Sequence, residues 1–189
     1  MKKRVFVVGV ALTLILVGFV GIARTESTAM VSFNAPHVAR HSAATTTKDL
    51  DLKLASDVAP TTTALLIDRS LRTTGSYLHF GLNHPTSLKF DNEEREGNCI
   101  EYANLFALIF DRMATRAHSS AHAYSVHSTD ARLLGQIVPG RGMGEHDWVL
   151  VVDSTPTGEK RYYIDPTFYD MGLPSDITKG VHGPITPPN

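Results

Sequence analysis

The sequence predicts an α+β domain in which helices come first and an antiparallel sheet follows. Apolar residues recur at three- and four-residue spacing from Cys99 to about Ala117, which is typical of a helix with one apolar face. Strand-like segments separated by turns occupy much of the chain after Ala121. Because these strands do not alternate with helices, we expect antiparallel pairing, with the long helix packed against the sheet.

The composition allows a packed core and gives no sign of a polyanionic partner. The chain has 189 residues, of which 42% are hydrophobic and 20% are charged, enough for one ordinary domain with extensions. The formal net charge is −1, whereas binding to nucleic acid by charge requires a positive excess. We therefore expect no nucleic-acid partner.

The N-terminus has the pattern of an export signal. Lys2-Lys3-Arg4 precedes an uncharged, apolar run from Val5 to Ala23, which suits a cleaved signal peptide and is also just long enough for a membrane anchor. Both interpretations stay open. In either case residues 1–23 engage the membrane or the export machinery, and the rest is expected outside the cytoplasm: periplasmic, secreted or membrane-anchored.

The domain itself is expected at residues 61–176. Residues 24–60 are rich in Ala, Thr and Ser and are interpreted as a flexible linker, although Asp49 to Leu54 alternates and is compatible with a short strand. Residues 177–189 contain several prolines and are expected to be a flexible tail.

Within the domain, turn and capping residues mark the elements. Thr61-Thr62-Thr63 offers an N-cap for a helix that ends near Gly75. Residues 77–95 carry Gly, Asn, Pro and acidic residues and are expected to be irregular. Strands are expected at Ala121 to His127 and Leu133 to Val138.

Cys99 is the only cysteine, and it lies where the long helix is expected to begin. Asn98 can cap that helix with Glu101 in a capping box, and the free N–H groups of the first turn favour a thiolate. Gly97 removes a side chain next to the sulfur. An unpaired cysteine outside the cytoplasm indicates a reactive thiol or an intermolecular bridge, and a buried inert thiol is the third possibility.

A histidine and an aspartate follow on two strands that read as a hairpin. His146 to Asp153 and Lys160 to Asp165 flank a turn-like segment, so symmetrical pairing places His146 opposite Asp165. There the carboxylate would orient the imidazole toward the thiol. The alternatives are that Asp165 before Pro166 only begins a turn and that Trp148 is a core residue.

These residues resemble the three motif blocks of the transglutaminase-like superfamily. The blocks are Gly97-Asn98-Cys99 opening a helix, His146-Asp147-Trp148 on a strand, and Asp165-Pro166-Thr167 ending the next strand. The resemblance covers about residues 61–168. It implies a papain-like, transglutaminase-like core with Cys99 as nucleophile, His146 as general base and acid, and Asp165 as orienter.

The expected function is therefore thiol-dependent acyl transfer on a protein or peptide substrate. Cys99 would attack a peptide or glutamine carboxamide carbonyl to give a thioester, which water or an amine resolves. A small preference goes to hydrolysis, because the enzyme meets bulk water. No cofactor and no calcium are expected. The backbone N–H of Cys99 is one candidate oxyanion donor; the sequence does not place the second, for which a side chain between Tyr77 and Asn92 is a candidate.

Two other functions compete with this one. His118, His122 and His127 cluster near the end of the long helix and raise the possibility of a metal site, although no Cys or acidic partner has ligand spacing. The chain is alternatively a non-catalytic transglutaminase-like binding or scaffold module of the cell envelope.

Overall fold

The computed structural model describes residues 31–34, 37–56, 62–81, 85–91, 93–133, 136–137, 144–155, 158–186 and 188. The expected signal or anchor at residues 1–23 lies outside these ranges. None of the helices in the described ranges is long and apolar enough to cross a membrane.

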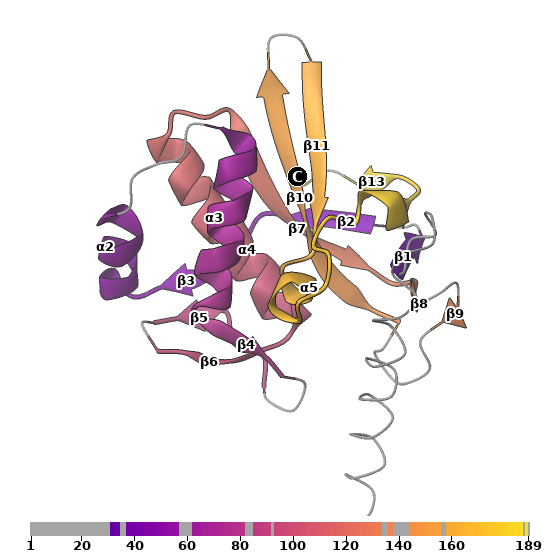
Figure 1. Ribbon diagram of the computed structural model, residues 1–189, viewed down its shortest axis with the longest axis horizontal. Coiled ribbons are helices and arrows are strands. Elements are labelled where there is room, and N and C mark those ends of the chain that lie inside the picture. Colours follow the sequence, from indigo (N-terminus) through magenta and orange to yellow (C-terminus); the bar gives the residue numbers. More distant parts are fainter. Residues whose placement is uncertain are drawn as a thin grey trace, which may run out of the picture.

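The described residues form an α+β structure, as the sequence predicts (Figure 1). The helices are α2 (Lys48–Ser56), α3 (Thr63–Gly75), α4 (Cys99–Arg116), α5 (Pro166–Asp170) and a 3₁₀ turn (Thr178–Gly180). The largest sheet has the order β11 (Gly158–Ile164), β10 (His146–Thr155), β7 (Ala121–Ser128), β2 (His37–Arg40) and β13 (Ile185–Thr186). Its pairs are antiparallel except β2–β13, which is parallel.

Smaller sheets extend this framework. One has the order β12 (Val181–His182), β1 (Val31–Asn34), β8 (Ala131–Leu133) and β9 (Gln136–Ile137). Two parallel pairs join β3 (Thr45–Thr46) to β5 (Lys89–Phe90) and β4 (Leu78–Phe80) to β6 (Arg95–Gly97). The segment expected to be irregular thus carries three short strands, and the strand expected at Leu133 to Val138 is replaced by the β8–β9 hairpin.

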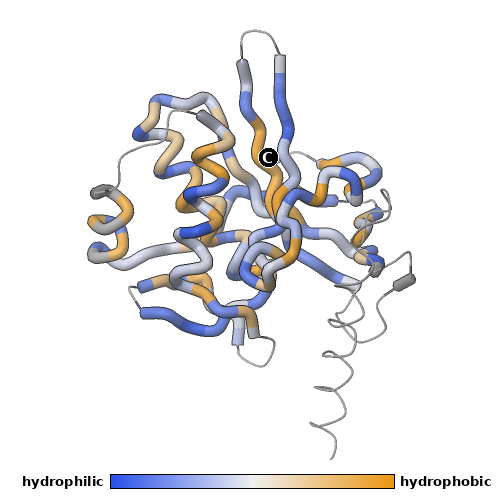
Figure 2. Tube along the Cα trace, in the orientation of Figure 1, coloured by the Kyte–Doolittle hydropathy of each residue, from blue (hydrophilic) through white to orange (hydrophobic). Residues whose placement is uncertain are grey.

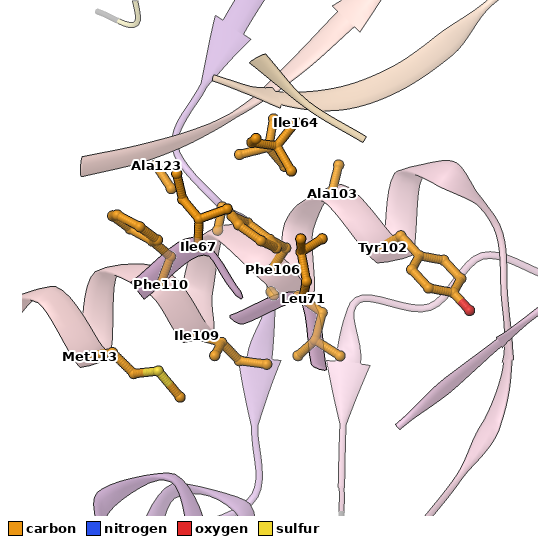
Figure 3. Close-up of a cluster of buried hydrophobic side chains, with 14 of the residues drawn as sticks. Ile67, Leu71, Tyr102, Ala103, Phe106, Ile109, Phe110, Met113, Ala123 and Ile164 are labelled. Carbon is orange, nitrogen blue, oxygen red and sulfur yellow. The ribbon is translucent and has the colours of Figure 1, made fainter. Parts of the chain in front are cut away.

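The main core lies between α4 and one face of the large sheet. Figure 3 shows Phe106 and Phe110 of α4 turned toward Ala123 and Ile164 of the sheet. Figure 2 shows apolar positions recurring along α3 and a run of them along β10. Helix α3 covers α4 from outside. Its N-cap is Thr62, whose side chain accepts a hydrogen bond from the N–H of Leu65, as the threonine run predicts.

A second buried cluster covers the opposite face of the sheet. Trp148 and Leu150 alternate along β10 with Val149 and Val151 of the main core, so β10 is buried on both faces. Phe33 of β1 belongs to this second cluster and is fully buried. The domain therefore has two apolar layers separated by the sheet.

Three expectations about the ends of the domain are corrected by these strands. Within the expected linker at residues 24–60, β1 and β2 pair with β8 and β7, so the described part of it belongs to the fold. The expected tail at residues 177–189 supplies β12 and β13. The domain is thus larger than residues 61–176, because strands from both ends complete the two sheets.

The alternating segment Asp49 to Leu54 is helical rather than extended. Leu50 and Leu54, four residues apart, are both buried on the inner side of α2, whereas Leu52 is exposed. Alternation over so short a window also fits a helix, because positions i and i+4 share a helix face. Burial against α4 decides between the two.

Candidate active site

The first turn of α4 is capped as the sequence predicts. The Asn98 side chain accepts hydrogen bonds from the N–H groups of Ile100 at 3.0 Å and Glu101 at 3.4 Å, and Glu101 accepts from the N–H of Asn98. The carbonyl of Asn98 accepts from the N–H of Tyr102. These contacts pair the N–H groups on both sides of Cys99. Within the described ranges the N–H of Cys99 itself has no partner.

Glu101 is buried, and its charge is paired. Arg95 donates to its carboxylate at 2.6 Å and also to the carbonyl of Ser87, whose N–H donates to the same carboxylate. This pairing removes most of the like-charge penalty that an isolated carboxylate would impose on a thiolate at Cys99. The same hydrogen bonds connect the loop at Ser87 to the first turn of α4.

Gly97 has a packing role that the sequence did not indicate. A Cβ at this position would lie 3.0 Å from a methyl group of Leu78 on the neighbouring strand β4. The glycine lets β4 and β6 approach closely just before the helix begins.

His146 and Asp165 are in contact, as predicted. The His146 Nε2 and Asp165 Oδ2 atoms are 2.6 Å apart, and the Asp165 side chain is fully buried. The other Asp165 oxygen accepts hydrogen bonds from the N–H groups of Thr167 and Phe168 and so caps α5. Asp165 therefore begins a turn and holds the imidazole at the same time.

The third side chain completes the cluster. Nε2 of His146 is occupied by Asp165, which leaves Nδ1 for another partner, and the Cys99 side chain is near enough to raise the pKa of the ring. Cys99 is partly exposed. The structure thus brings the three predicted residues together, and their catalytic role stays a prediction.

The environment of His146 favours its charged form. Burial of the ring acts to lower the pKa of His146, but the Asp165 carboxylate and the Cys99 side chain act against it and hold the pKa well above 6.5. The Asp165 carboxylate and the Cys99 side chain thus favour the imidazolium form of His146 over the neutral ring. An imidazolium in contact with a thiol stabilises the thiolate, which is the nucleophilic form.

Two aromatic rings stack on the imidazole of His146. Phe33 stacks on His146 with ring centroids 5.4 Å apart and an interplanar angle of 12°, and Phe168 stacks with a centroid distance of 5.6 Å. The sequence did not reveal either residue, because Phe33 lies in the expected linker and Phe168 carries no pattern. Only the Asp-Pro-Thr block, which directly precedes Phe168, pointed to this neighbourhood.

Trp148 is a core residue rather than a cover for the thiol. It is fully buried, and its indole N–H donates to Ser128 Oγ at 2.7 Å. Ser128 Oγ also contacts Nδ1 of His37, whose Nε2 donates to the carbonyl of His182. This chain of hydrogen bonds ties β10, β7, β2 and the C-terminal strands together behind His146.

The alternative metal site is not assembled. Helix α4 ends at Arg116 and His118 has a positive φ of 53°, so His118 and His122 do not share a helix face. His122 is exposed, and His127 pairs with Asp147. Among the described residues no group of three His, Cys, Asp or Glu side chains could hold a metal ion.

Two hollows lie away from this cluster. One of about 510 Å³ is bounded by Asp51, Asp111 and Arg112, and another of about 580 Å³ by Thr63, His118 and Asp153. Neither is lined by Cys99, His146 or Asp165.

Comparison with known proteins gives no match to a family model, to a curated protein or to a solved structure. The likeness to the transglutaminase-like superfamily therefore rests on the three motif blocks and on their meeting in space.

Proposed function

We propose that the chain is an exported thiol-dependent acyl-transfer enzyme with a transglutaminase-like, papain-type core. The observation that carries the proposal is the 2.6 Å contact of His146 with Asp165, together with the action of the Cys99 side chain on the pKa of His146. A nucleophile, a base and a group that orients the base are the parts that this chemistry requires.

In the first half of the reaction the Cys99 thiolate attacks the carbonyl carbon of a peptide or carboxamide. The tetrahedral intermediate collapses by breaking the C–N bond, and the His146 imidazolium gives its proton to the departing amine. A thioester on Cys99 and a neutral imidazole remain. Asp165 keeps the ring in place by accepting from Nε2.

In the second half water attacks the thioester, and His146 takes its proton. The intermediate releases a carboxylic acid and restores the thiolate–imidazolium pair. A primary amine in place of water gives a new amide, which is transamidation. We favour hydrolysis, because bulk water is in excess wherever the exported domain works.

The free N–H of Cys99 supplies one donor for the oxyanion of the tetrahedral intermediate. Asn98 takes up the neighbouring N–H groups, so the Cys99 N–H is held at the helix terminus with its direction fixed. One such donor contributes about 3 kcal/mol to transition-state stabilisation.

Thiol labelling at pH 6 tests the proposal. Iodoacetamide should alkylate Cys99 in the purified full chain, and His146→Gln should slow the reaction about tenfold or more because the imidazolium is lost. His122→Gln, which alters an exposed histidine on β7, is the matched control and should leave the rate unchanged. Equal rates in wild type and His146→Gln would favour the scaffold module instead.

Turnover is then measured on a mixed peptide library, with and without a primary amine. Products should appear with wild type and disappear with Cys99→Ser. Turnover that survives this substitution would rule out Cys99 as the nucleophile.

A further inference from the structure

A second histidine–carboxylate pair joins β7 to β10, where Asp147 directly follows His146. His127 Nδ1 and Asp147 Oδ1 are 2.9 Å apart, on directly opposed positions of β7 and β10. The Asp147 side chain is only 9% exposed, whereas His127 is 28% exposed. Within the described ranges the other His127 nitrogen, Nε2, has no partner, so it is free to bind a further group.

The packing of α4 puts this pair beside the first turn of the helix. Asn104 contacts Ser125 of β7, and Asp111 accepts a hydrogen bond from the N–H of Ala123, so α4 runs antiparallel to β7. From Asn104 back to Ile100 the helix advances by about 6 Å. From Ser125 forward to His127 the strand advances by about 7 Å in the same direction. Ile100, adjacent to Cys99, is therefore level with His127 on the same side of the sheet.

Exposed apolar side chains flank His127 in the same place. Val38 is its directly opposed neighbour on β2 and therefore points to the same face. Val38 is 37% exposed and Ile100 is 38% exposed. Across the described ranges four large apolar side chains are exposed, and these are two of them. Both lie at the same level of the sheet as His127, close to the start of α4.

We propose that Val38, Ile100 and His127 form an aliphatic subsite for the acyl substrate of Cys99. An aliphatic side chain next to the reacting carbonyl packs between Val38 and Ile100, and His127 Nε2 hydrogen-bonds to the peptide backbone. Asp147 is the positioning residue, because it fixes the imidazole through Nδ1. The subsite rests on the proposed function and names its substrate class: peptides with a branched aliphatic residue at the acyl position.

Labelling with peptidyl acyloxymethyl ketones tests the subsite in the full chain. Three probes carry valine, alanine or aspartate next to the ketone. Wild type should react with the valine probe about tenfold faster than with the alanine probe, because burial of the two extra carbons favours binding. The aspartate probe should be slowest. Val38→Ser and Ile100→Ser should each reduce the valine preference to about threefold or less.

The matched control is Leu65→Ser. Leu65 is another exposed apolar residue, but it lies in the first turn of α3. That turn contacts Asp153, which is roughly 23 Å along β10 from His146. This variant should keep the wild-type preference. A wild type without any preference, or one that Val38→Ser and Ile100→Ser leave unchanged, would overturn the subsite.

His127 has its own test. His127→Ala should slow the valine probe about fivefold or more, and His127→Gln, which keeps an N–H donor near the Nε2 position, should recover most of the rate. Asp147→Asn keeps the acceptor for Nδ1 and should behave like His127→Gln. If His127 only stabilises the fold, the melting temperature will fall while the probe rates stay at the wild-type value.

Iodoacetamide separates failure of the subsite from failure of the proposed function. This small reagent needs the Cys99–His146 pair but no subsite, so its rate should not change in any of these variants. Loss of its dependence on His146 would instead count against the enzyme itself.

Discussion

His146 and Asp165 lie just beyond the last pair of the β10–β11 hairpin, at diagonal rather than directly opposed positions. Val149 pairs with Ile164 and Thr155 with Gly158, so the register differs by two residues from the symmetrical hairpin that the sequence suggested. In this register Leu150, not Trp148, lies opposite Tyr163. A shift of two residues keeps every side chain on its face, and diagonal positions are still within reach of long side chains. The 2.6 Å contact between His146 and Asp165 therefore forms even though the register predicted from the sequence was wrong by two residues.

Asp165→Asn should separate the two roles of this carboxylate. The asparagine keeps an oxygen for the N-cap of α5, but it removes the charge that raises the pKa of His146. The imidazolium then loses its proton at lower pH, and alkylation of Cys99 near pH 6 to 7 should slow about tenfold. The measurement is the pH profile of iodoacetamide labelling.

Asp165→Ala is the companion variant, because it removes the cap as well. It should show the same labelling defect and should lose about 1 kcal/mol more stability than Asp165→Asn in urea unfolding. A profile for Asp165→Asn that superimposes on wild type would contradict the role given to the carboxylate.

The raised pKa of His146 also makes the stability of the fold depend on pH. A group whose pKa is higher in the folded than in the unfolded state stabilises the fold most below its unfolded pKa, here 6.5. That contribution is lost as the pH rises through the folded pKa. The loss of unfolding free energy in His146→Gln, measured in urea, should therefore be larger at pH 6 than at strongly alkaline pH. If the loss of unfolding free energy instead grows with pH, folding does not raise the pKa of His146.

Phe33 should matter for both stability and reactivity, because it is fully buried and stacks on His146. Phe33→Ala should cost about 3–5 kcal/mol of unfolding free energy. Phe33→Leu keeps most of the volume and should cost less, while still removing the stacked ring and slowing Cys99 labelling. Urea unfolding and labelling rates measure the two effects. A Phe33→Ala protein of wild-type stability would mean that β1 is not part of the fold.

Removing only one partner of the Arg95–Glu101 ion pair should lower the free energy of unfolding substantially. Arg95→Met leaves the buried Glu101 carboxylate without its guanidinium and should destabilise the domain by about 3–5 kcal/mol in urea. Adding Glu101→Gln should recover part of that loss. The control is Arg72→Ala, which breaks an exposed i,i+4 pair with Asp68 and should cost less than about 1 kcal/mol. Equal losses in Arg95→Met and Arg72→Ala would show that burial does not matter here.

Local patterns in the sequence were sufficient for the helices next to the site. The capping box at Asn98 and the threonine cap at Thr62 were both predicted correctly, because capping depends on residues three positions apart. The alternating segment that forms α2 was predicted wrongly. Its burial depends on α4, more than forty residues later, and a short window contains no trace of that contact.

By itself, the sequence determined the α+β class, the start of α4 at Cys99 and the three residues of the candidate site. Each of these follows from spacing along the chain or from residue type. The tertiary structure alone decided the hairpin register, the place of Phe33 against His146 and the entry of β1, β2, β12 and β13 into the sheets. Those depend on which distant segments bury one another's apolar surface, and pairing between distant segments leaves no periodic signal in a single sequence.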